Sequence, residues 1–323
     1  MTDATTKTIH GIPVIDMAPA LDGRAAGERR VAAEFRRAAT EVGFFYVKNH
    51  GVPWHLIEAA RAAAHAFFAL PAERKAEVRV DANHRGFLRI GEARMADGAA
   101  PDLKESFVWG REIAPADAAL APDNPFLRPN NWPSFMPELR RAAEPYFEAT
   151  LECGRRLLAL FAVAMDLPRD TFIRHWRHPI ARGALVYYPP HPTEGGGARF
   201  GVAPHTDYGC LTVLCQDATG GLEIETRAGD WVAAHPIEGT FVVNVGDLLA
   251  RWTNDGFAST RHRVINRGGS ERYSLVVAVD PDFETLVDPT VACHDANRPH
   301  TPPVRCGDYV LARFDQAFAY RKP

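Results

Sequence analysis

At 323 residues, with 46% hydrophobic and 24% charged residues, the sequence has a globular composition and room for one large domain or two small ones. A formal net charge of −3 excludes bulk attraction to nucleic acid or to an anionic membrane surface. Five widely spaced cysteines without a C-x-x-C pair argue against a disulfide framework and a cysteine zinc site, and no segment has the apolar length of a signal peptide or a membrane span. We therefore expect a cytoplasmic protein with reduced thiols and with no nucleic-acid or membrane partner, whose oligomeric state the sequence leaves unknown.

Two pairs of strand and helix are predicted near the N-terminus. Residues 12–16 have the β-branched composition of a short strand, and residues 43–47 form an aromatic and β-branched run. Residues 23–42 repeat apolar side chains at helical spacing, and a second such segment runs from 53 to 70, where Pro71 ends it. This order predicts helices packed on a sheet.

Residues 79–135 are rich in proline and predict a long, irregular connection. Within a compact domain such a segment usually carries function or is mobile, so it is a candidate for lining a substrate pocket. A plain surface loop is an equally good interpretation of the same pattern. The side chains that would face a substrate from this segment are Arg85, Phe87, Lys104, Phe107 and Trp109.

The second half of the sequence changes from a helix to short strands. Residues 137–167 carry an apolar stripe at helical spacing, and Pro145 marks either a kink or the start of that helix. Short strands separated by Gly and Pro follow, as in all-β sandwiches and barrels, at 183–188, 203–207, 211–216, 221–226, 231–235, 240–245, 259–266, 272–279 and 308–312. We expect a single unit with an N-terminal helical and loop region (1–135), bracing helices (136–180) and a β core with a C-terminal tail (181–323).

Three side chains in the β region have the pattern of a metal site. His205 and Asp207 are two residues apart, so a strand would direct both to the same face. His262 would join them from the half-buried strand predicted at 259–266. Two imidazoles and one carboxylate on one side of a metal leave positions open and are associated with non-haem Fe(II) oxygenases. An H-x-D pair alone is weak evidence, because His and Asp occur at this spacing by chance.

A second pair strengthens the interpretation. Arg272 and Ser274 are also two residues apart, and they follow His262 by the length of one turn and the start of the next strand. An arginine directed into a barrel is costly unless it meets an anion, and its planar fork suits a carboxylate. A small 2-oxo dicarboxylate would chelate the metal and reach the arginine, so 2-oxoglutarate is the expected co-substrate, and the two pairs should be neighbours in one barrel.

The sequence resembles the isopenicillin N synthase-like family of Fe(II)/2-oxoglutarate-dependent oxygenases over nearly its whole length. The N-terminal signatures are Ile12-Pro13-Val14-Ile15-Asp16, Gly43-Phe44-Phe45 and Asn49-His50-Gly51-Val52. The signatures of the core are Tyr187-Tyr188-Pro189-Pro190, His205-Thr206-Asp207, Asn244-Val245-Gly246-Asp247, Ser259-Thr260-Arg261-His262-Arg263-Val264 and Arg272-Tyr273-Ser274. One residue departs from the pattern, because Val186 stands where many plant members have an asparagine.

The resemblance implies a mainly β fold, with a double-stranded β-helix (jelly roll) core and flanking helices. It implies Fe(II) at His205, Asp207 and His262 and the distal carboxylate of 2-oxoglutarate at Arg272 and Ser274, with Tyr188 contributing from an adjacent strand. The implied reaction consumes O₂ and 2-oxoglutarate, releases succinate and CO₂, and hydroxylates, desaturates or cyclises a small molecule.

Substrate contacts are predicted only from residue type. An apolar lining would come from Phe107, Trp109, Leu214, Trp252, Phe314 and Phe318, and an anion contact from Arg85, Lys104 and Arg251. For each residue taken singly, ordinary packing or surface solvation is favoured over a substrate contact by roughly two to one. Three other functions fit the ligand pattern: an oxidase of the same fold that uses Fe(II) and O₂ without 2-oxoglutarate, a metal-binding jelly roll without turnover, and a hydrolytic zinc site. The last two leave Arg272 and Ser274 unexplained.

Overall fold

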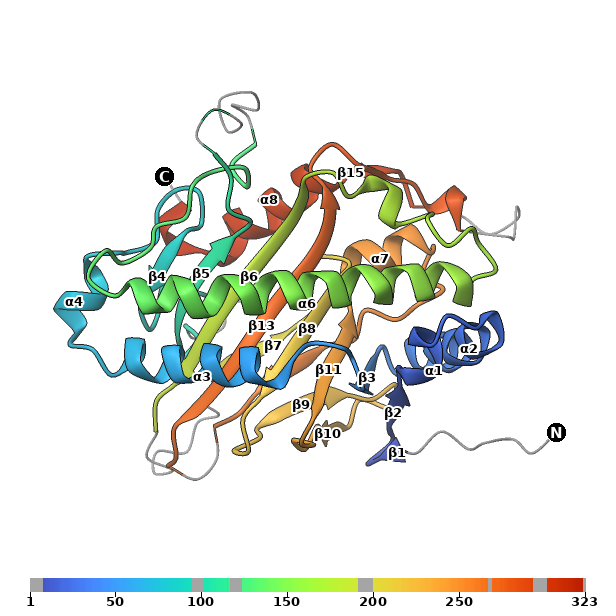
Figure 1. The fold of residues 1–323 in the computed structure, drawn as a ribbon, viewed down its shortest axis with the longest axis horizontal. Coiled ribbons are helices and arrows are strands. Elements are labelled where there is room, and N and C mark those ends of the chain that lie inside the picture. The colour runs from blue at the N-terminus through green and yellow to red at the C-terminus, as the bar shows by residue number, and fades with distance from the viewer. Residues whose placement is uncertain are drawn as a thin grey trace.

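The computed structural model describes residues 8–94, 101–114, 116, 124–190, 200–266, 269–292 and 301–321. Its centre is a large twisted sheet with two long helices across one face and a smaller sheet behind the other (Figure 1). Two sheets that face each other in this way form the jelly-roll core, as predicted.

The large sheet has nine strands in the order β1-β2-β3-β11-β8-β13-β6-β5-β4. Most neighbours are antiparallel, and the exception is the parallel pair β2 and β3. The bounds of these strands are β1 Thr8–Ile9, β2 Ile12–Asp16, β3 Phe44–Lys48, β4 Gly86–Leu88, β5 Glu105–Gly110, β6 Pro179–Tyr188, β8 Leu211–Gln216, β11 Thr240–Val245 and β13 Arg272–Asp282.

The small sheet has the order β10-β9-β12-β7, with β7 Val202–His205, β9 Leu222–Glu225, β10 Trp231–Ala233 and β12 His262–Val264. A separate pair joins β14 Leu286–Val287 to β15 Val304–Arg305. A compact apolar cluster fills much of the space between the two main sheets, with Phe44 and Tyr46 from β3 and Ile224 and Val264 from the small sheet. The rest of that space is the cavity described below.

The helices are α1 Ala18–Leu21, α2 Ala25–Glu41, α3 Trp54–Phe68, α4 Ala72–Ala76, α6 Pro137–Ala164, α7 Asp247–Trp252 and α8 Cys306–Ala317, with short 3₁₀ turns η1 Ile173–His175, η2 Pro289–Val291 and η3 Ala319–Arg321. Helices α3 and α6 run across the outer face of the large sheet (Figure 1). Helix α6 approaches β13 so closely that a Cβ at Gly154 would lie 2.7 Å from Val279. The largest hydrophobic core lies between these helices and the sheet. Pro145 lies inside α6, so the helix neither starts nor ends there.

Two expectations from the sequence are wrong. Residues 308–312 belong to helix α8, whose buried face includes Val310 and Phe314 at helical spacing. The segment 79–135 is not all loop, because β5 is a fully paired strand of the large sheet. Strands β12 and β13 follow each other in the chain but lie in different sheets, so their side chains meet across the space between the sheets.

The described cysteines are free thiols in the interior of the protein. Cys153, Cys210, Cys215 and Cys306 are free and buried, while Cys293 lies outside the described residues. Among the described residues, no helix combines the length and apolarity needed to cross a membrane.

Candidate active site

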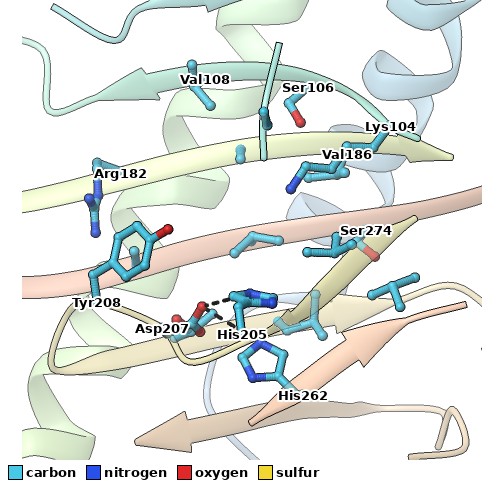
Figure 2. Close-up of a pocket in the computed structure, with 18 of the residues that line it drawn as sticks. Lys104, Ser106, Val108, Arg182, Val186, His205, Asp207, Tyr208, His262 and Ser274 are labelled. Atoms are coloured by element: carbon cyan, nitrogen blue, oxygen red, sulfur yellow. Dashed lines mark ion pairs between the residues drawn. The ribbon is translucent and has the colours of Figure 1, made fainter. Parts of the chain in front are cut away.

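A cavity of about 220 Å³ lies between the two sheets. That volume exceeds the roughly 150 Å³ of an apolar cavity that binds benzene, so small organic molecules fit. Figure 2 shows side chains of the large sheet, such as Ser106 and Arg182, on one side of it, and His205 and His262 on the other. The cavity therefore brings strands of both sheets to one space.

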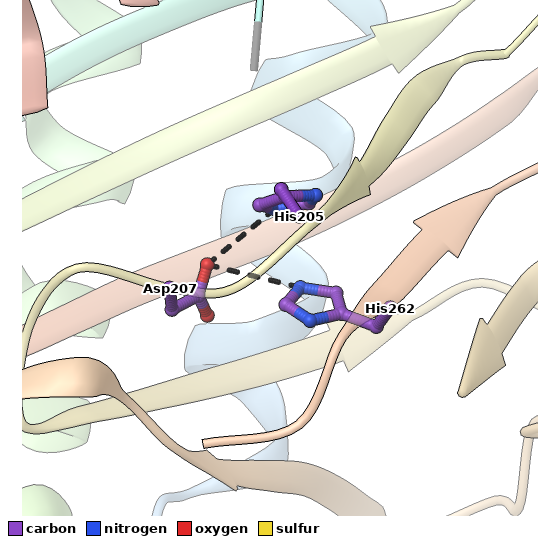
Figure 3. A group of neighbouring side chains, drawn as sticks. All are labelled: His205, Asp207 and His262. Atoms are coloured by element: carbon purple, nitrogen blue, oxygen red, sulfur yellow. Dashed lines mark ion pairs between the residues drawn. The ribbon is translucent and has the colours of Figure 1, made fainter. Parts of the chain in front are cut away.

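The three predicted metal ligands meet at the wall formed by the small sheet (Figure 3). His205 ends β7 and His262 begins β12, and the two residues are direct partners in the antiparallel register. Asp207 Oδ1 lies 3.6 Å from His205 Nε2 and 3.7 Å from His262 Nε2. One potential ligand atom from each residue lies within 4.8 Å of the others. This arrangement fits iron binding on one face, with the other face open to the cavity.

Hydrogen bonds fix the orientation of these three side chains. Nδ1 of His205 lies 2.8 Å from the carbonyl oxygen of Ala203, and Nδ1 of His262 lies 3.2 Å from that of Thr260. A carbonyl oxygen accepts a hydrogen bond from Nδ1–H, so each neutral imidazole carries its proton on Nδ1 and presents an unprotonated Nε2 to the site. Asn244 donates to Asp207 Oδ2 at 2.8 Å and holds the carboxylate in place.

The protonation states also suit a metal. Burial and the neighbouring His205 lower the pKa of His262 to about 4, so its imidazole is neutral at neutral pH. Burial alone would raise the pKa of Asp207, but the adjacent imidazoles of His262 and His205 hold it below its ordinary value. Neutral imidazole and ionised carboxylate are the forms that bind a metal.

The loop after Asp207 is tied to the large sheet. The amide of Cys210 donates to Asp280 Oδ1 at 2.7 Å, and a Cβ at Gly209 would overlap that same oxygen. Only glycine therefore fits at 209 without displacing Asp280. The amide of Asp247 donates to the carbonyl oxygen of Asp207 at 2.8 Å, which ties the same loop to the start of α7.

Arg272 and Ser274 lie across the cavity from the metal triad. Arg272 is 1% exposed and Ser274 2%. Nε of Arg272 donates to the carbonyl of Gly220, and its guanidinium lies 4.6 Å from the ring centroid of Tyr188, its register partner on β6. Nη1 and Nη2 of Arg272 and Oγ of Ser274 have no hydrogen-bond partner among the described residues. A buried cation with two unpaired donor nitrogens needs an anion, and the fork of a guanidinium matches a carboxylate.

Four of the proposed substrate residues line the cavity: Lys104, Leu214, Phe314 and Phe318. The two phenylalanines come from α8 and the residue that follows it. Lys104 precedes β5 and reaches toward the centre of the cavity (Figure 2).

The other proposed substrate residues lie elsewhere among the described residues. Phe107 and Trp109 alternate with cavity-lining neighbours on β5 and therefore point to the helices, where Phe107 contacts Phe67 and Trp109 contacts Phe147. Phe87 also packs on Phe67.

Two arginines and one tryptophan are likewise outside the cavity. Arg85 is fully buried and donates to the backbone carbonyls of Asn83, His84 and Phe126. Arg251 donates to the carbonyl of Pro302, and Trp252 packs edge-on against Phe172. These side chains stabilise the loops and the core.

Several cavity residues were not identified from the sequence: His84, Ser106, Val108, Arg182 and Tyr208. The strand alternation in 105–110 could have identified two of them, because Ser106 and Val108 occupy the face of the strand opposite to Phe107. A similar alternation in β6 places Arg182 on the same face as Tyr188.

Comparison with known proteins identifies the family. Residues 12–135 match the family model described as the N-terminal region of non-haem dioxygenase in morphine synthesis, and residues 182–281 match that of the 2OG-Fe(II) oxygenase superfamily. The 2-oxoglutarate-Fe(II) type oxidoreductase hxnY of Emericella nidulans is 31% identical over 96% of this chain and 92% of its own length. The 2-oxoglutarate-dependent dioxygenase citB of Monascus ruber is 33% identical over 88% and 89%.

Solved structures agree with this assignment. A full-length protein of Neurospora crassa, in complex with alpha-KG and thymine, superposes with a TM-score of 0.83 at 28% identity over 94% of this chain and 96% of that one. A putative 2OG-Fe(II) oxygenase family protein of Caulobacter crescentus gives a TM-score of 0.83 at 28% identity over 95% and 99%. The chain therefore belongs to the isopenicillin N synthase-like group of the 2OG-Fe(II) oxygenase superfamily and is a non-haem, Fe(II)- and 2-oxoglutarate-dependent dioxygenase.

Proposed function

We propose that His205, Asp207 and His262 hold the Fe(II), and that Arg272 and Ser274 hold the distal carboxylate of 2-oxoglutarate. The observation that carries this assignment is the buried guanidinium of Arg272, whose Nη1 and Nη2 lack partners among the described residues on the cavity side opposite to the triad. A dicarboxylate chelated at the triad would satisfy both nitrogens and the hydroxyl of Ser274.

Tyr188 completes the proposed co-substrate site. The centroid of its ring lies 4.6 Å from the guanidinium carbon of Arg272, which is within the range of a cation–π contact. Val186, which also lines the cavity, offers only an apolar surface. Val186 therefore cannot make the polar contact that an asparagine would supply at this position.

The bound Fe(II) and 2-oxoglutarate supply the oxidising chemistry, in which O₂ is consumed, succinate and CO₂ are released and a substrate C–H bond is oxidised. The residues of the chain orient the reactants and exclude water. Asn244 and the two Nδ1 hydrogen bonds preset the ligand geometry, and the side chains of Leu88, Val108 and Phe314 give the rest of the cavity an apolar lining. We infer that the substrate is a small molecule that undergoes hydroxylation, with desaturation or ring closure as variants of the same chemistry.

The alternatives account for less of the structure. Arg272 is 1% exposed and forms a second, cationic site. A zinc hydrolase or a binding protein without turnover would not need such a buried cation. An oxidase that works without 2-oxoglutarate would likewise leave the Nη1 and Nη2 donors unsatisfied.

The test is an anaerobic titration of the protein with Fe(II) and 2-oxoglutarate, monitored by the metal-to-ligand charge-transfer absorption. We expect the wild type to develop the band, His262→Ala to lose it, and His55→Ala to retain it, because His55 is an exposed histidine of α3. Succinate release in air tests turnover. Absence of the band in wild type at saturating 2-oxoglutarate, or its persistence in His262→Ala, would refute the residue assignment.

A further inference from the structure

The cavity has two ends, and the register of the large sheet separates them. Tyr188 on β6 pairs with Arg272 on β13, whereas Arg182 on β6 pairs with Ala278. Six positions along a strand span roughly 20 Å, and a molecule of the size of 2-oxoglutarate covers only part of that length. If 2-oxoglutarate binds at Arg272, as proposed above, the Arg182 end is left for the substrate. Figure 2 shows the metal triad between Arg182 on one side and Ser274 on the other.

The Arg182 end has an aromatic wall. The guanidinium carbon of Arg182 lies 5.0 Å from the ring centroid of Phe314, and that ring contacts the rings of His84 and Phe318. All four side chains line the cavity. His84 adds no charge, because burial and the charge of Arg182 lower its pKa well below the ordinary value, and its Nδ1 is paired with the hydroxyl of Tyr320. This end therefore combines aromatic surfaces with the donors of a guanidinium.

Asp280 balances the charge of Arg182 without using all of its donors. Nη2 of Arg182 donates to Oδ2 of Asp280 at 2.8 Å, and the side chain of Asp280 is fully buried. Burial raises the pKa of Asp280, but Arg182 and the amide of Cys210, which donates to Oδ1, favour its ionised form. A guanidinium has five N–H donors, and Asp280 is the one hydrogen-bond partner of this side chain among the described residues. The other donors are therefore available to a ligand, while the ion pair as a whole is neutral.

Lys104 is paired in the same way and lies at the other end of the cavity. Glu105 on β5 pairs with Tyr187 on β6, which puts Lys104 beside Tyr188 at the end proposed for 2-oxoglutarate. Its Nζ lies 3.6 Å from Oδ2 of Asp102, whose side chain is fully buried. Lys104 therefore brings no charge to the Arg182 end.

The charges of the cavity loaded with Fe(II) and 2-oxoglutarate then balance. The distal carboxylate of 2-oxoglutarate would neutralise Arg272, and its chelating carboxylate, together with Asp207, would balance the charge of Fe(II). Arg182 and Lys104 have carboxylates of their own. A substrate that brought a carboxylate to the Arg182 end would therefore bury an uncompensated charge, which is more costly than burying a hydrogen-bonded polar group.

We propose that the substrate is a small, uncharged carbonyl compound whose oxygen accepts a hydrogen bond from Arg182, and that the Arg182–Asp280 pair excludes carboxylates from this end of the cavity. A ketone, an amide or a lactone accepts such a bond without adding a charge, and a charge left unpaired is an effective means of rejecting the wrong ligand. The rest of the molecule lies against the apolar side chains of Val108 and Phe314. This inference rests on the assignment of Arg272 to 2-oxoglutarate.

The experiment compares ligands that differ in one group. 1-Phenylpropan-2-one, phenylacetamide, phenylacetate and n-propylbenzene share an aromatic body, and 2-heptanone and hexanoate repeat the comparison of ketone with acid on an aliphatic body. Each is added at neutral pH to the anaerobic protein loaded with Fe(II) and 2-oxoglutarate, and its Kd is taken from the shift of the charge-transfer band. We expect at least one ketone or amide to shift the band and to bind roughly tenfold or more tightly than the matched acid.

The outcomes separate this proposal from the co-substrate assignment. If no ketone or amide shifts the band, or if an acid shifts it with the affinity of the matched ketone, the proposal is wrong. An acid that acts only by displacing 2-oxoglutarate abolishes the band instead of shifting it, and this result supports the exclusion of acids from the Arg182 end. Absence of the band in wild type before any ligand is added would instead refute the assignment of Arg272 to 2-oxoglutarate.

Two variants locate the effect. Asp280→Asn keeps an acceptor for Arg182 and for the amide of Cys210 but removes the negative charge, so the acid should gain roughly tenfold or more in affinity relative to the ketone. The double variant Arg182→Met, Asp280→Asn leaves no buried charge unpaired, and it should weaken the ketone roughly tenfold while leaving n-propylbenzene unchanged. Lys48→Met, which removes a half-exposed cation paired with Asp16 outside the cavity, is the control and should retain the wild-type affinities. An acid-to-ketone ratio that is unchanged in Asp280→Asn, or a ketone affinity that is unchanged in the double variant, overturns the proposal.

Discussion

Replacing either of two buried arginines of the large sheet by methionine should have different consequences. Arg182→Met should mainly reduce the free energy of unfolding, and Arg272→Met should mainly reduce the affinity for 2-oxoglutarate. Arg182 is paired with the fully buried carboxylate of Asp280, whereas Arg272 has no carboxylate partner among the described residues. Arg182→Met would leave the Asp280 charge unpaired, and breaking a buried pair costs about 3–5 kcal/mol. For Arg272→Met, the lost bond to Gly220 and ring contact with Tyr188 are offset by removal of a buried, half-satisfied cation. These opposing contributions are each about 1–3 kcal/mol, so the net change should be within about 2 kcal/mol.

The co-substrate affinity should show the reverse order. Two charge-assisted hydrogen bonds of about 1.5–3 kcal/mol each correspond to a loss of about 10² to 10⁴-fold in the affinity of Arg272→Met for 2-oxoglutarate. Arg182→Met, where it remains folded, should keep the affinity of the wild type within about tenfold, because Arg182 lies at the other end of β6.

Urea unfolding of the metal-free proteins and anaerobic titration with 2-oxoglutarate measure the two quantities separately. If Arg272→Met lost as much unfolding free energy as Arg182→Met while binding 2-oxoglutarate normally, Arg272 would be a structural residue and the reasoning would fail.

Three further predictions concern other parts of the molecule. Asn244→Ala removes the hydrogen bond to Asp207 and should weaken Fe(II) binding about 10- to 100-fold in an anaerobic titration, with little change in melting temperature. Phe107→Ala should cost about 3–5 kcal/mol of unfolding free energy, because the ring is fully buried under α3, whereas Phe318→Ala at the cavity should change mainly the KM of the substrate. Burial lowers the pKa of His50 to about 4, so its contribution to stability is complete above about pH 6.5 and is lost as the pH falls toward 4; His50→Leu should flatten that part of a urea-unfolding series against pH.

Strand periodicity predicted the core of the site because it depends on local geometry. An i, i+2 spacing places two side chains on one face wherever a strand forms, so the inward pair Arg272 and Ser274 followed directly from the sequence. His205 and Asp207 lie together although β7 ends at His205, so the short spacing alone keeps the two side chains close. The structure confirms the predicted limits of β8 and β11, and both strands are flanked by residues that favour turns.

Contacts between distant segments could not be predicted in this way. Phe107 and Trp109 looked like substrate residues because they are aromatic and lie in a proline-rich stretch, but which face of β5 meets the helices is decided by α3 and α6. Arg182 was overlooked because nothing near it in sequence indicates that Asp280, 98 residues later, would hold it beside the cavity. The division of the chain at 135 and 180 stays a prediction, although β2 to β5 already contribute to the same sheet as the core strands.

The structure joins the substrate wall to the metal loop through one carboxylate. Asp247 Oδ2 accepts hydrogen bonds from Thr206, which stands between His205 and Asp207, at 3.2 Å and from Arg313 of α8 at 2.9 Å. The next residue of α8, Phe314, lines the cavity. The helix that lines the cavity and the segment that carries two of the three proposed iron ligands are therefore hydrogen-bonded to the same carboxylate. We expect Asp247→Asn, which weakens both hydrogen bonds, to change both the affinity for Fe(II) and the KM of the substrate, as measured by anaerobic titration and by succinate release.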